Sequence, residues 1–541
     1  VTDEIQFDYS DELQGTDDSL IIQGSGVLSV VPLGDSFATW NPVWNAVLSN
    51  GFYDSDGGYG SFEGLRIQDS FGLSVGKVGN SADVTVSSPL SLDGPIRLHG
   101  GSVFIADTIA TTASEGIQLF AHDNIKVEAK RSSSVGSTTV TPYAISTNGG
   151  SITLNSNRDD NGGAINLDRV TLDSDGGNIS LVGGSDGSGY AEGVNVDAMD
   201  HLSVQTLMTG VFLNGVTLDA SGASTGGSIT LRGRGWQGAA NTDSAKYPIG
   251  IDLVSYVMDS NDRGTQIITN GSGTVDLDGI GGNQNTGSTH NVGINFYSGT
   301  AARNSIQTDE GALSLTGTAG TTVTSLKRAG INVDGGIVDI YSNSGAINLE
   351  GIGGSSDIGI LSSATFNVGS DGTNAGTSGN ITLQTDRISA SGSINLRASG
   401  TVTLEPRSDS FSGTMTWPDT NLSVHADATG LTIGKASNST AVVVASATSI
   451  NGPISIYGGA VTLDGALTTT SESLGDVTIQ TTGLAGNAGI SLANGRALTV
   501  TQSGDSTYAG VIAGASSTLT KAGAGTLTLT ANSLNLLPLL I

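Results

Sequence analysis

Short apolar segments with a period of two residues recur along most of the chain. The clearest form is Gly-x-[Ile/Val]-x-Leu, in which the two apolar side chains are two residues apart and therefore face one side of a strand. The intervening Ser, Thr, Asn or Asp faces the other side. No long segment shows the 3.6-residue period of an amphipathic helix. The pattern predicts many short strands with one dry and one wet face, at 150–154, 163–167, 177–181, 227–231, 273–277, 345–349, 379–383, 392–396 and 400–404.

The chain also contains a much longer repeat. Residues 71–112 and 429–470 align without a gap at an offset of 358, with 18 identities in 42 positions. The shared residues are turn glycines and the alternating apolar positions between them. Upstream, Asp35-Ser36-Phe37 recurs as Asp409-Ser410-Phe411 at an offset of 374, so the first copy carries 16 more residues before the aligned block. Internal repetition of this kind predicts similar modules stacked along one axis.

These patterns predict an all-β protein built as a right-handed parallel β-helix, with coils of roughly 20–25 residues. Parallel strands usually need crossover helices, and a solenoid is the way to stack them without helices. An antiparallel sandwich array is the competing architecture. We divide the chain into an N-terminal β region with an aromatic insertion (1–66), β-helix repeats (67–405) and a second partial copy of the long repeat (406–541).

The insertion at 34–66 is the least repetitive part of the chain, and we expect a short helix or a loop excursion there. Its aromatic residues include Trp40 and Trp44. They are expected to pack on the neighbouring coil, and a carbohydrate-stacking patch is the alternative.

The composition narrows the choice of partners. With 50 acidic against 21 basic residues, the net charge is −29 and the pI is near 4.2. Nucleic acid is a poor partner for such a surface, because binding it depends on Lys and Arg, and an anionic membrane is disfavoured for the same reason. No apolar run reaches the length of a membrane span. The chain has no cysteine, a weak indication of an exported protein that does not rely on disulfides.

Divalent cations suit an acidic surface better, and one segment resembles the start of a calcium loop. Asn157, Asp159 and Asn161 precede a glycine at alternating positions, and Asp168 stands at the twelfth position. Asn replaces Asp at the first position and Asp replaces Glu at the last. We therefore keep two hypotheses for these residues, a Ca²⁺ site and a polar turn without metal.

Catalysis is the alternative to a structural role. Enzymes that cleave glycosidic bonds use paired carboxylates, and the candidate pairs here are Asp54/Asp56, Asp173/Asp175 and Asp276/Asp278, all in or beside glycine turns. The sequence joins no convincing His or Arg to them, and the five histidines are scattered. The Thr-x-Thr runs are too few and irregular to indicate an ice-binding face. We predict no catalytic residues.

Two parts of the chain resemble known families. The segments NGPISIYGGAVTLDGALTTT and SGNITLQTDRISASGSINLRASGTVTL are similar in style to the repeats of filamentous-haemagglutinin-like adhesins and related bacterial surface proteins. Residues 508–530 resemble the autotransporter-associated β-strand repeat. The matching positions are Gly510, Ile512, Gly514, Leu519, Lys521, Gly523, Gly525, Leu527 and Leu529.

The resemblance implies an exported β-helical stalk with a role in adhesion, biofilm or a surface layer. We therefore predict an extracellular structural or adhesive protein rather than an enzyme, with a β-helical polysaccharide lyase or glycosidase as the alternative. The expected partners are further copies of the chain, joined head to tail or laterally, and a host or matrix polysaccharide. The chain departs from the family style after 530, where it ends in NSLNLLPLLI. This apolar tail is the predicted assembly segment, with Leu534, Leu536, Leu537, Leu539 and Leu540 as its contact residues.

Overall fold

A computed structural model describes most of residues 20–531. The residues outside the described part are 1–19, 24–25, 33, 38–41, 46–50, 55–64, 69–70, 135–136, 195–207, 238–246, 256–263, 284–289, 300–301, 322–326, 354–357, 371–378, 420 and 532–541. The chain divides into two compact units, unit 1 (1–308 and 320–327) and unit 2 (309–319 and 328–541). Among the described residues, none belongs to a helix long and apolar enough to cross a membrane.

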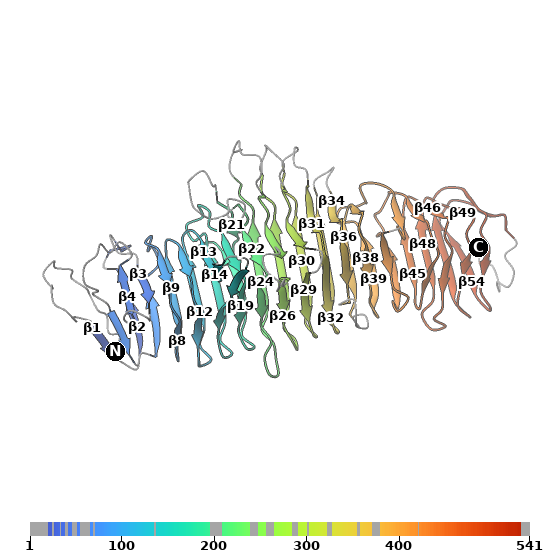
Figure 1. Cartoon of the computed structure of the whole chain (residues 1–541). Helices are drawn as coiled ribbons and strands as arrows, with labels where there is room; N and C mark the ends of the chain where they lie inside the picture. The colour runs from blue at the N-terminus through green and yellow to red at the C-terminus, as the bar shows by residue number, and fades with distance from the viewer. Residues whose placement is uncertain are drawn as a thin grey trace. The chain divides into compact units, whose positions relative to one another are not determined.

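Unit 1 is a parallel β-helix with three sheets (Figure 1). From β6 onward the chain passes from sheet A to B to C in each coil. Sheet A contains β2 (Val27–Val30), β6 (Gly72–Val75), β9 (Ile96–Gly100), β12 (Ile117–Ala121), β17 (Ile152–Ser156), β20 (Ile179–Gly183), β24 (Ile229–Arg234) and β27 (Val275–Ile280), with the short β21 (Ala191–Glu192) beside β24. Sheet B contains β7 (Val84–Val86), β10 (Val103–Ile105), β13 (Ile125–Glu128), β18 (Ile165–Asp168), β22 (Val211–Asn214), β25 (Ile251–Ser255) and β28 (Ile294–Ser298). Sheet C contains β8 (Leu90–Leu92), β11 (Ile109–Thr111), β16 (Tyr143–Ser146), β19 (Val170–Asp173), β23 (Thr217–Asp219), β26 (Gln266–Ile268) and β29 (Arg303–Thr308).

Unit 2 repeats this arrangement with its own three faces. The first contains β30 (Leu313–Thr318), β33 (Ile347–Ile352), β36 (Ile381–Thr385), β39 (Thr401–Glu405), β42 (Gly430–Ile433), β45 (Ile454–Tyr457), β48 (Val477–Thr481), β51 (Ala497–Gln502) and β54 (Thr518–Ala522). The second contains β31 (Ala329–Asp334), β34 (Ile358–Ser362) and β37 (Ile388–Ala390), then β40 (Met415–Trp417), β43 (Val442–Val444), β46 (Ala460–Leu463) and β49 (Gly483–Gly486), and finally β52 (Ser506–Tyr508) and β55 (Leu527–Leu529). The third contains β32 (Ile337–Ser342), β35 (Thr365–Val368), β38 (Ile394–Leu396) and β41 (Leu422–Val424), then β44 (Thr448–Ile450), β47 (Leu467–Thr469), β50 (Ile490–Ser491) and β53 (Ile512–Ala513).

The stacking between coils is parallel and in register, which confirms the parallel β-helix and excludes the antiparallel sandwich array. On sheet A, Ile152 lies opposite Ile179, which in turn lies opposite Ile229. These side chains are completely buried, whereas the alternating Thr153 and Ser180 are half-buried on the outer face. The dry and wet faces predicted from the sequence are therefore the inside and the outside of the coil.

Most of the Gly-x-Ile-x-Leu segments form strands of sheet A in unit 1 or of the first face in unit 2. The glycine that opens these segments is required for a steric reason. A Cβ on Gly227 would lie 2.0 Å from the carbonyl oxygen of Gly177, and a Cβ on Gly177 would lie 2.1 Å from that of Gly150. Neighbouring coils approach so closely at this corner that a side chain would overlap the backbone of the preceding coil.

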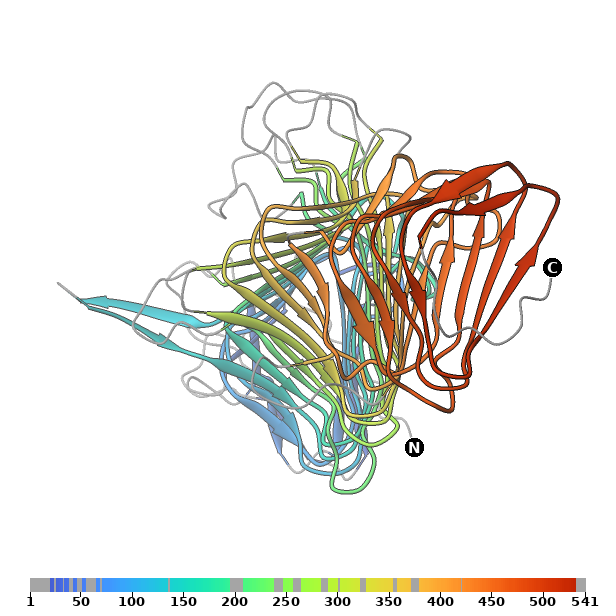
Figure 2. The same cartoon turned by 90° about the vertical axis from the view of Figure 1, so that its right-hand side faces the viewer.

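Coil length varies more than we expected from the sequence. The hydrogen bond from Arg97 to Gln118 joins equivalent outer positions 21 residues apart, as predicted. The bond from Ser228 N to Asn178 Oδ1 joins equivalent positions 50 residues apart. Insertions at the corners lengthen the middle coils without changing the stacking of their strands, since loop length has a small entropic cost. One such insertion is the antiparallel hairpin of β14 (Lys130–Ser134) and β15 (Ser137–Thr141), which projects from unit 1 (Figure 2).

The N-terminal insertion is also β structure in its described residues, which corrects the expectation of a short helix. Strand β3 (Pro42–Asn45) pairs antiparallel with β4 (Gly51–Asp54), and β4 pairs antiparallel with β5 (Leu65–Gln68). Strand β5 also pairs with β1 (Leu20–Gln23). Trp40 lies outside the described residues, so its packing stays a prediction.

The two copies of the long repeat fold alike. Trp44 on β3 lies opposite Val86, and Trp417 on β40 lies opposite Val444, so the two tryptophans occupy equivalent positions that the alignment did not match. The two parts of the repeat that are separated in sequence also meet in space. Phe37 N donates to Asn80 Oδ1 at 3.2 Å, and Phe411 N donates to Asn438 Oδ1 at 3.3 Å.

The asparagine at this turn satisfies three stretches of backbone in each copy. Asn438 Nδ2 donates to the carbonyl oxygens of Thr440 (3.3 Å) and Tyr457 (2.8 Å), while its Oδ1 also accepts from Thr440 N (3.2 Å). Asn80 makes the matching bonds to Ala82 and His99. Both asparagines are buried, so loss of either would leave buried backbone groups without partners.

We therefore expect Asn438→Ala to lower the free energy of unfolding by about 2 kcal/mol, because buried polar groups lose their partners. Urea unfolding followed by circular dichroism measures this. The control is Ser437→Ala, whose exposed hydroxyl donates only to Asp409 O at 2.9 Å among the described residues. Equal midpoints for the two variants would contradict the role assigned to Asn438.

Candidate functional site

The residues predicted to bind calcium form a tight polar loop with its own hydrogen bonds. Asn157 has a left-handed backbone (φ 53°), and its Oδ1 accepts from Gly162 N at 2.7 Å. Its Nδ2 donates to Tyr190 O at 3.3 Å. Asp159 accepts from the backbone and side-chain nitrogens of Asn161, at 3.2 and 3.1 Å. The loop thus joins Asn157, Asp159 and Asn161 through local hydrogen bonds.

Asp168 has different partners. It lies at the end of β18 on sheet B, where its Oδ1 accepts from Asn214 Nδ2 at 2.8 Å and lies 3.9 Å from Arg169 Nε. No group of three or more His, Cys, Asp or Glu is arranged to hold a metal ion within the described part of the chain. Calcium binding by these residues stays a prediction. The predicted assembly residues Leu534, Leu536, Leu537, Leu539 and Leu540 lie outside the described residues.

The three candidate acid pairs lie in different environments. Asp54 ends β4, and Asp56 lies outside the described residues. Asp173 Oδ1 accepts from Asp175 N at 3.1 Å, so this pair is closed on itself in a turn. Asp276 and Asp278 both lie on β27 of sheet A, at alternating outward positions opposite Thr230 and Arg232. The structure therefore gives the third pair the arginine neighbour that the sequence did not reveal.

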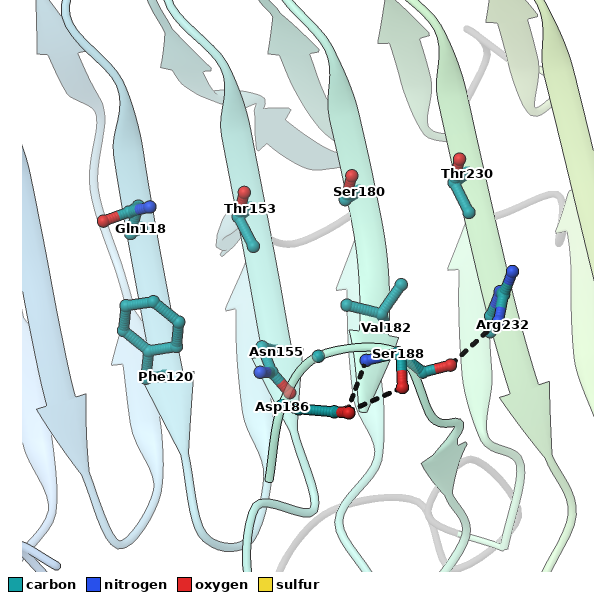
Figure 3. A pocket seen from close by; sticks show the side chains of 11 residues that line it. Gln118, Phe120, Thr153, Asn155, Ser180, Val182, Asp186, Ser188, Thr230 and Arg232 are labelled. Atoms are coloured by element: carbon teal, nitrogen blue, oxygen red, sulfur yellow. Dashed lines mark hydrogen bonds between the residues drawn. The ribbon is translucent and has the colours of Figure 1, made fainter. Parts of the chain in front are cut away.

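An open groove of about 320 Å³ lies on the outer face of sheet A in unit 1. It crosses β12, β17, β20 and β24. Its floor is a row of uncharged polar side chains, one from each strand, that lie side by side across the sheet (Figure 3). The residues of this row are Gln118, Thr153, Ser180 and Thr230.

A second row beside the first contains apolar and charged groups. It consists of Phe120, Asn155, Val182 and Arg232. Phe120 stacks on His99 with ring centroids 4.6 Å apart, and the Arg158 guanidinium lies 4.8 Å from the ring centroid. Burial, followed by the nearby Arg158 and Arg97, lowers the pKa of His99 to about 4, so this imidazole is neutral at pH 7. The positive charge beside Phe120 therefore comes from Arg158 and not from His99.

One wall of the groove is a short loop after β20 that holds Asp186, Gly187 and Ser188. Asp186 Oδ1 accepts from the backbone nitrogen and the hydroxyl of Ser188, at 2.9 and 2.7 Å. Arg232 Nη1 donates to Ser188 O at 2.8 Å, so the loop is tied to β24 (Figure 3). The bonds from Ser188 lower the pKa of Asp186, and its carboxylate is exposed and ionised at neutral pH.

Asn155, like Val182 (5% exposed), lines the groove but is almost fully buried, with 3% of its surface exposed. Its Oδ1 has no hydrogen-bond partner within the described part of the chain. Most buried polar groups in folded proteins are hydrogen-bonded, so a buried amide oxygen without a partner at a groove is a feature to be explained. The oxygen itself is buried, so a ligand in the groove does not reach it.

An acidic cluster lies beside the Arg232 end of the groove. Tyr190 donates its hydroxyl hydrogen to Asp278, and the Arg234 guanidinium lies 4.8 Å from the centroid of the Tyr190 ring. Burial raises the pKa of Asp276, against the opposing effect of Arg232. Burial also raises the pKa of Glu192, which lies 3.6 Å from Arg234. These groups combine carboxylates with arginines, as sites for polar ligands often do.

Sequence reasoning did not find this groove. The polar residue between the two apolar positions of each segment was visible at Thr153, Ser180 and Thr230. The missing information was which coils stack directly, because insertions separate these residues by 27 and 50 positions. Phe120, Asn155 and Asp186 carry no local signal at all.

Sheet B of unit 1 carries buried polar side chains on its outer face. Asn295 Nδ2 donates to Asp252 Oδ1 at 2.7 Å, in the same manner as Asn214 to Asp168. Asp252 is 6% exposed. Burial raises its pKa to about 7, and the bond from Asn295 opposes this only in part.

Comparison of the chain with protein-family models, with curated protein sequences and with solved structures gave no match. The repeated parallel β-strands fit the β-repeat character expected from the sequence. Membership of a particular adhesin family stays a prediction, and what the chain does must be inferred from its own residues.

The buried carboxyl of Asp252 predicts that the stability of unit 1 depends on pH. A folded-state pKa near 7, against an ordinary value of 3.8, means that the folded protein holds this proton more tightly than the unfolded chain does. The resulting stabilisation is complete below about pH 4 and is lost as the pH rises through 7, with a size of up to about 4 kcal/mol. We expect Asp252→Asn, which keeps the neutral shape, to flatten the dependence.

Urea unfolding at pH 5 and pH 8 tests this. The matched control is Asp93→Asn, which alters an exposed carboxyl of the same unit and should leave the wild-type pH dependence unchanged. If Asp252→Asn and the wild type lose the same free energy between pH 5 and pH 8, the assignment is wrong.

Proposed function

We propose that this chain is an extracellular structural and adhesive protein whose β-helical units act as stiff scaffolds that present their outer faces to a matrix. The observation that carries the proposal is the equivalence of the two copies of the long repeat, which place Asn80 and Asn438 in the same hydrogen bonds. A fold that grows by adding coils in one register is suited to spanning distance. The resemblance to filamentous-haemagglutinin-like adhesins supports the same role.

The physical basis of the stiffness is local to each unit. Every coil bonds to its neighbours through parallel ladders, and its inward side chains are buried in continuous rows. Opening one coil would break both ladders and expose apolar surface at once. The acidic, hydroxyl-rich exterior keeps such a scaffold soluble, since net charge far from zero opposes non-specific association.

Electron microscopy and surface attachment together test the proposal. We expect the purified chain to form rods or filaments, and to attach to polysaccharide-coated surfaces more than an acidic globular protein of similar mass does. Loss of filaments in chelator would support the calcium loop, and their loss after removal of residues 532–541 would support the apolar tail as the assembly segment. Compact particles that attach to none of the surfaces would contradict the function.

A polysaccharide-degrading enzyme is the second candidate. The observation that favours it is the cluster of Asp276, Asp278, Arg232 and Tyr190 beside the groove, because paired carboxylates can serve as acid and base in glycosidic bond cleavage. This candidate predicts release of reducing ends or unsaturated products from a polysaccharide. The release should fall at least a hundredfold in Asp276→Asn, whereas attachment without product release supports the adhesive function.

A further inference from the structure

We infer that the groove on sheet A of unit 1 binds an uncharged saccharide chain, laid across strands β12, β17, β20 and β24. The inference rests on the adhesive function proposed above, to which it adds a site and a class of ligand. It follows from three features of the groove: its spacing, its lining and the charge of its Asp186 wall.

The spacing favours a ligand that is itself a repeating chain. Neighbouring strands in a sheet are ~4.8 Å apart, so the four residues of the floor offer hydrogen-bonding groups over ~14 Å. Each strand contributes one such group, from Gln118 to Thr230. A polymer with hydroxyl groups at regular intervals can engage several strands at once, whereas a small compact ligand would use one or two.

The lining matches the two chemical characters of a sugar ring. Hydroxyl and amide side chains both donate and accept hydrogen bonds, as sugar hydroxyls do. The neighbouring row supplies apolar surface for the C–H face of a ring from the half-buried Phe120 at one end. The Phe120 ring is held in place by the stacked His99 and by Arg158, whose Nη2 also donates to Ser185 O at 3.0 Å. Aromatic side chains that are fixed in this way bind with little loss of entropy.

The Asp186 carboxylate in the wall of the groove disfavours an anionic group beside it, whereas Arg158 and Arg97 lie at the β12 end of the groove. Asp186 stands exposed and ionised in the groove wall, and Arg232, the arginine that lines the groove, already donates to Ser188 O. Both bonds from Ser188 fall on Oδ1 of Asp186, which leaves Oδ2 without a hydrogen bond among the described residues. A carboxylate oxygen is a strong acceptor for a hydroxyl and repels phosphate, sulfate or uronate groups.

Asn155 is a polar side chain that lines the groove beneath the Asp186 loop and is 3% exposed (Figure 3). Its Oδ1 is itself buried, so it offers no contact to a ligand in the groove. A peptide can bind to a sheet by adding a strand at its edge. This groove lies on the face of the sheet, so that binding mode does not apply here.

The test is calorimetric titration of the full chain with neutral oligosaccharides (glucan, mannan, galactan and xylan hexamers) and with acidic ones (polygalacturonate and alginate hexamers). We expect at least one neutral series to bind. Asp186→Asn and Phe120→Ala should each weaken this binding about tenfold, because one loses a charged acceptor and the other the stacking surface. Thr153→Ala should weaken it several-fold.

The matched control for Thr153→Ala is Thr478→Ala. Thr478 is half-buried on the first face of unit 2, where it stands opposite Ser455 and Thr499 in an equivalent outer row. It should leave the affinity unchanged. All four substitutions alter outward-facing or exposed side chains, and urea unfolding of each variant verifies that the fold is retained.

Four results would overturn the inference: no binding of any neutral oligosaccharide, binding of acidic oligosaccharides alone, groove variants with wild-type affinity, or an equal loss in Thr478→Ala. These outcomes separate the site from the function. If the groove variants still attach to polysaccharide-coated surfaces as the wild type does, the site is wrong and the adhesive function stands. If the wild type attaches to no surface and forms no rods, the adhesive function itself is wrong.

Discussion

The fold depends on the parallel backbone ladder between successive coils. Strands in the interior of each sheet donate to and accept from the coils on either side, so their polar backbone is satisfied and the side chains are free to sort by polarity. The isoleucine, leucine and valine side chains of successive coils then stack in rows inside the β-helix, as Ile152, Ile179 and Ile229 do. At the corners Gly177 and Gly227, a Cβ would meet the carbonyl oxygen of the preceding coil, 2.1 and 2.0 Å away, so these positions require glycine.

The pairing of backbone N–H and C=O groups is hardest to achieve at the corners, because the chain leaves the ladder there. Buried side chains then replace the missing backbone partners. Asn80 and Asn438 do so in the two copies of the long repeat, and Thr265 does so between coils of unit 1 by donating to Leu213 O and accepting from Val216 N. Asparagine and threonine in this chain therefore serve to hydrogen-bond the backbone at corners as well as to make the surface polar.

The groove on sheet A shows how a uniform fold acquires a local site. The strands that form its floor are ordinary members of the stack, and what distinguishes them is the long connections between them. One of these connections carries Asp186 and Ser188 against the sheet face and buries Asn155. Insertions are tolerated because they leave the ladder intact, so a β-helix can vary its loops while its core stays constant.

The sequence by itself determined the strands, their inner and outer faces, and the parallel β-helix, because a period of two and a glycine at each corner are local properties of the chain. It also determined that two copies of one module exist. It could not determine which outer side chains meet. The coils differ in length by tens of residues, and only the stacking registers bring Thr153, Ser180 and Thr230 side by side, or Arg232 opposite Asp278. The environment of each polar group, such as the burial that raises the pKa of Asp252, depends on neighbours distant in sequence and was likewise decided by the tertiary structure.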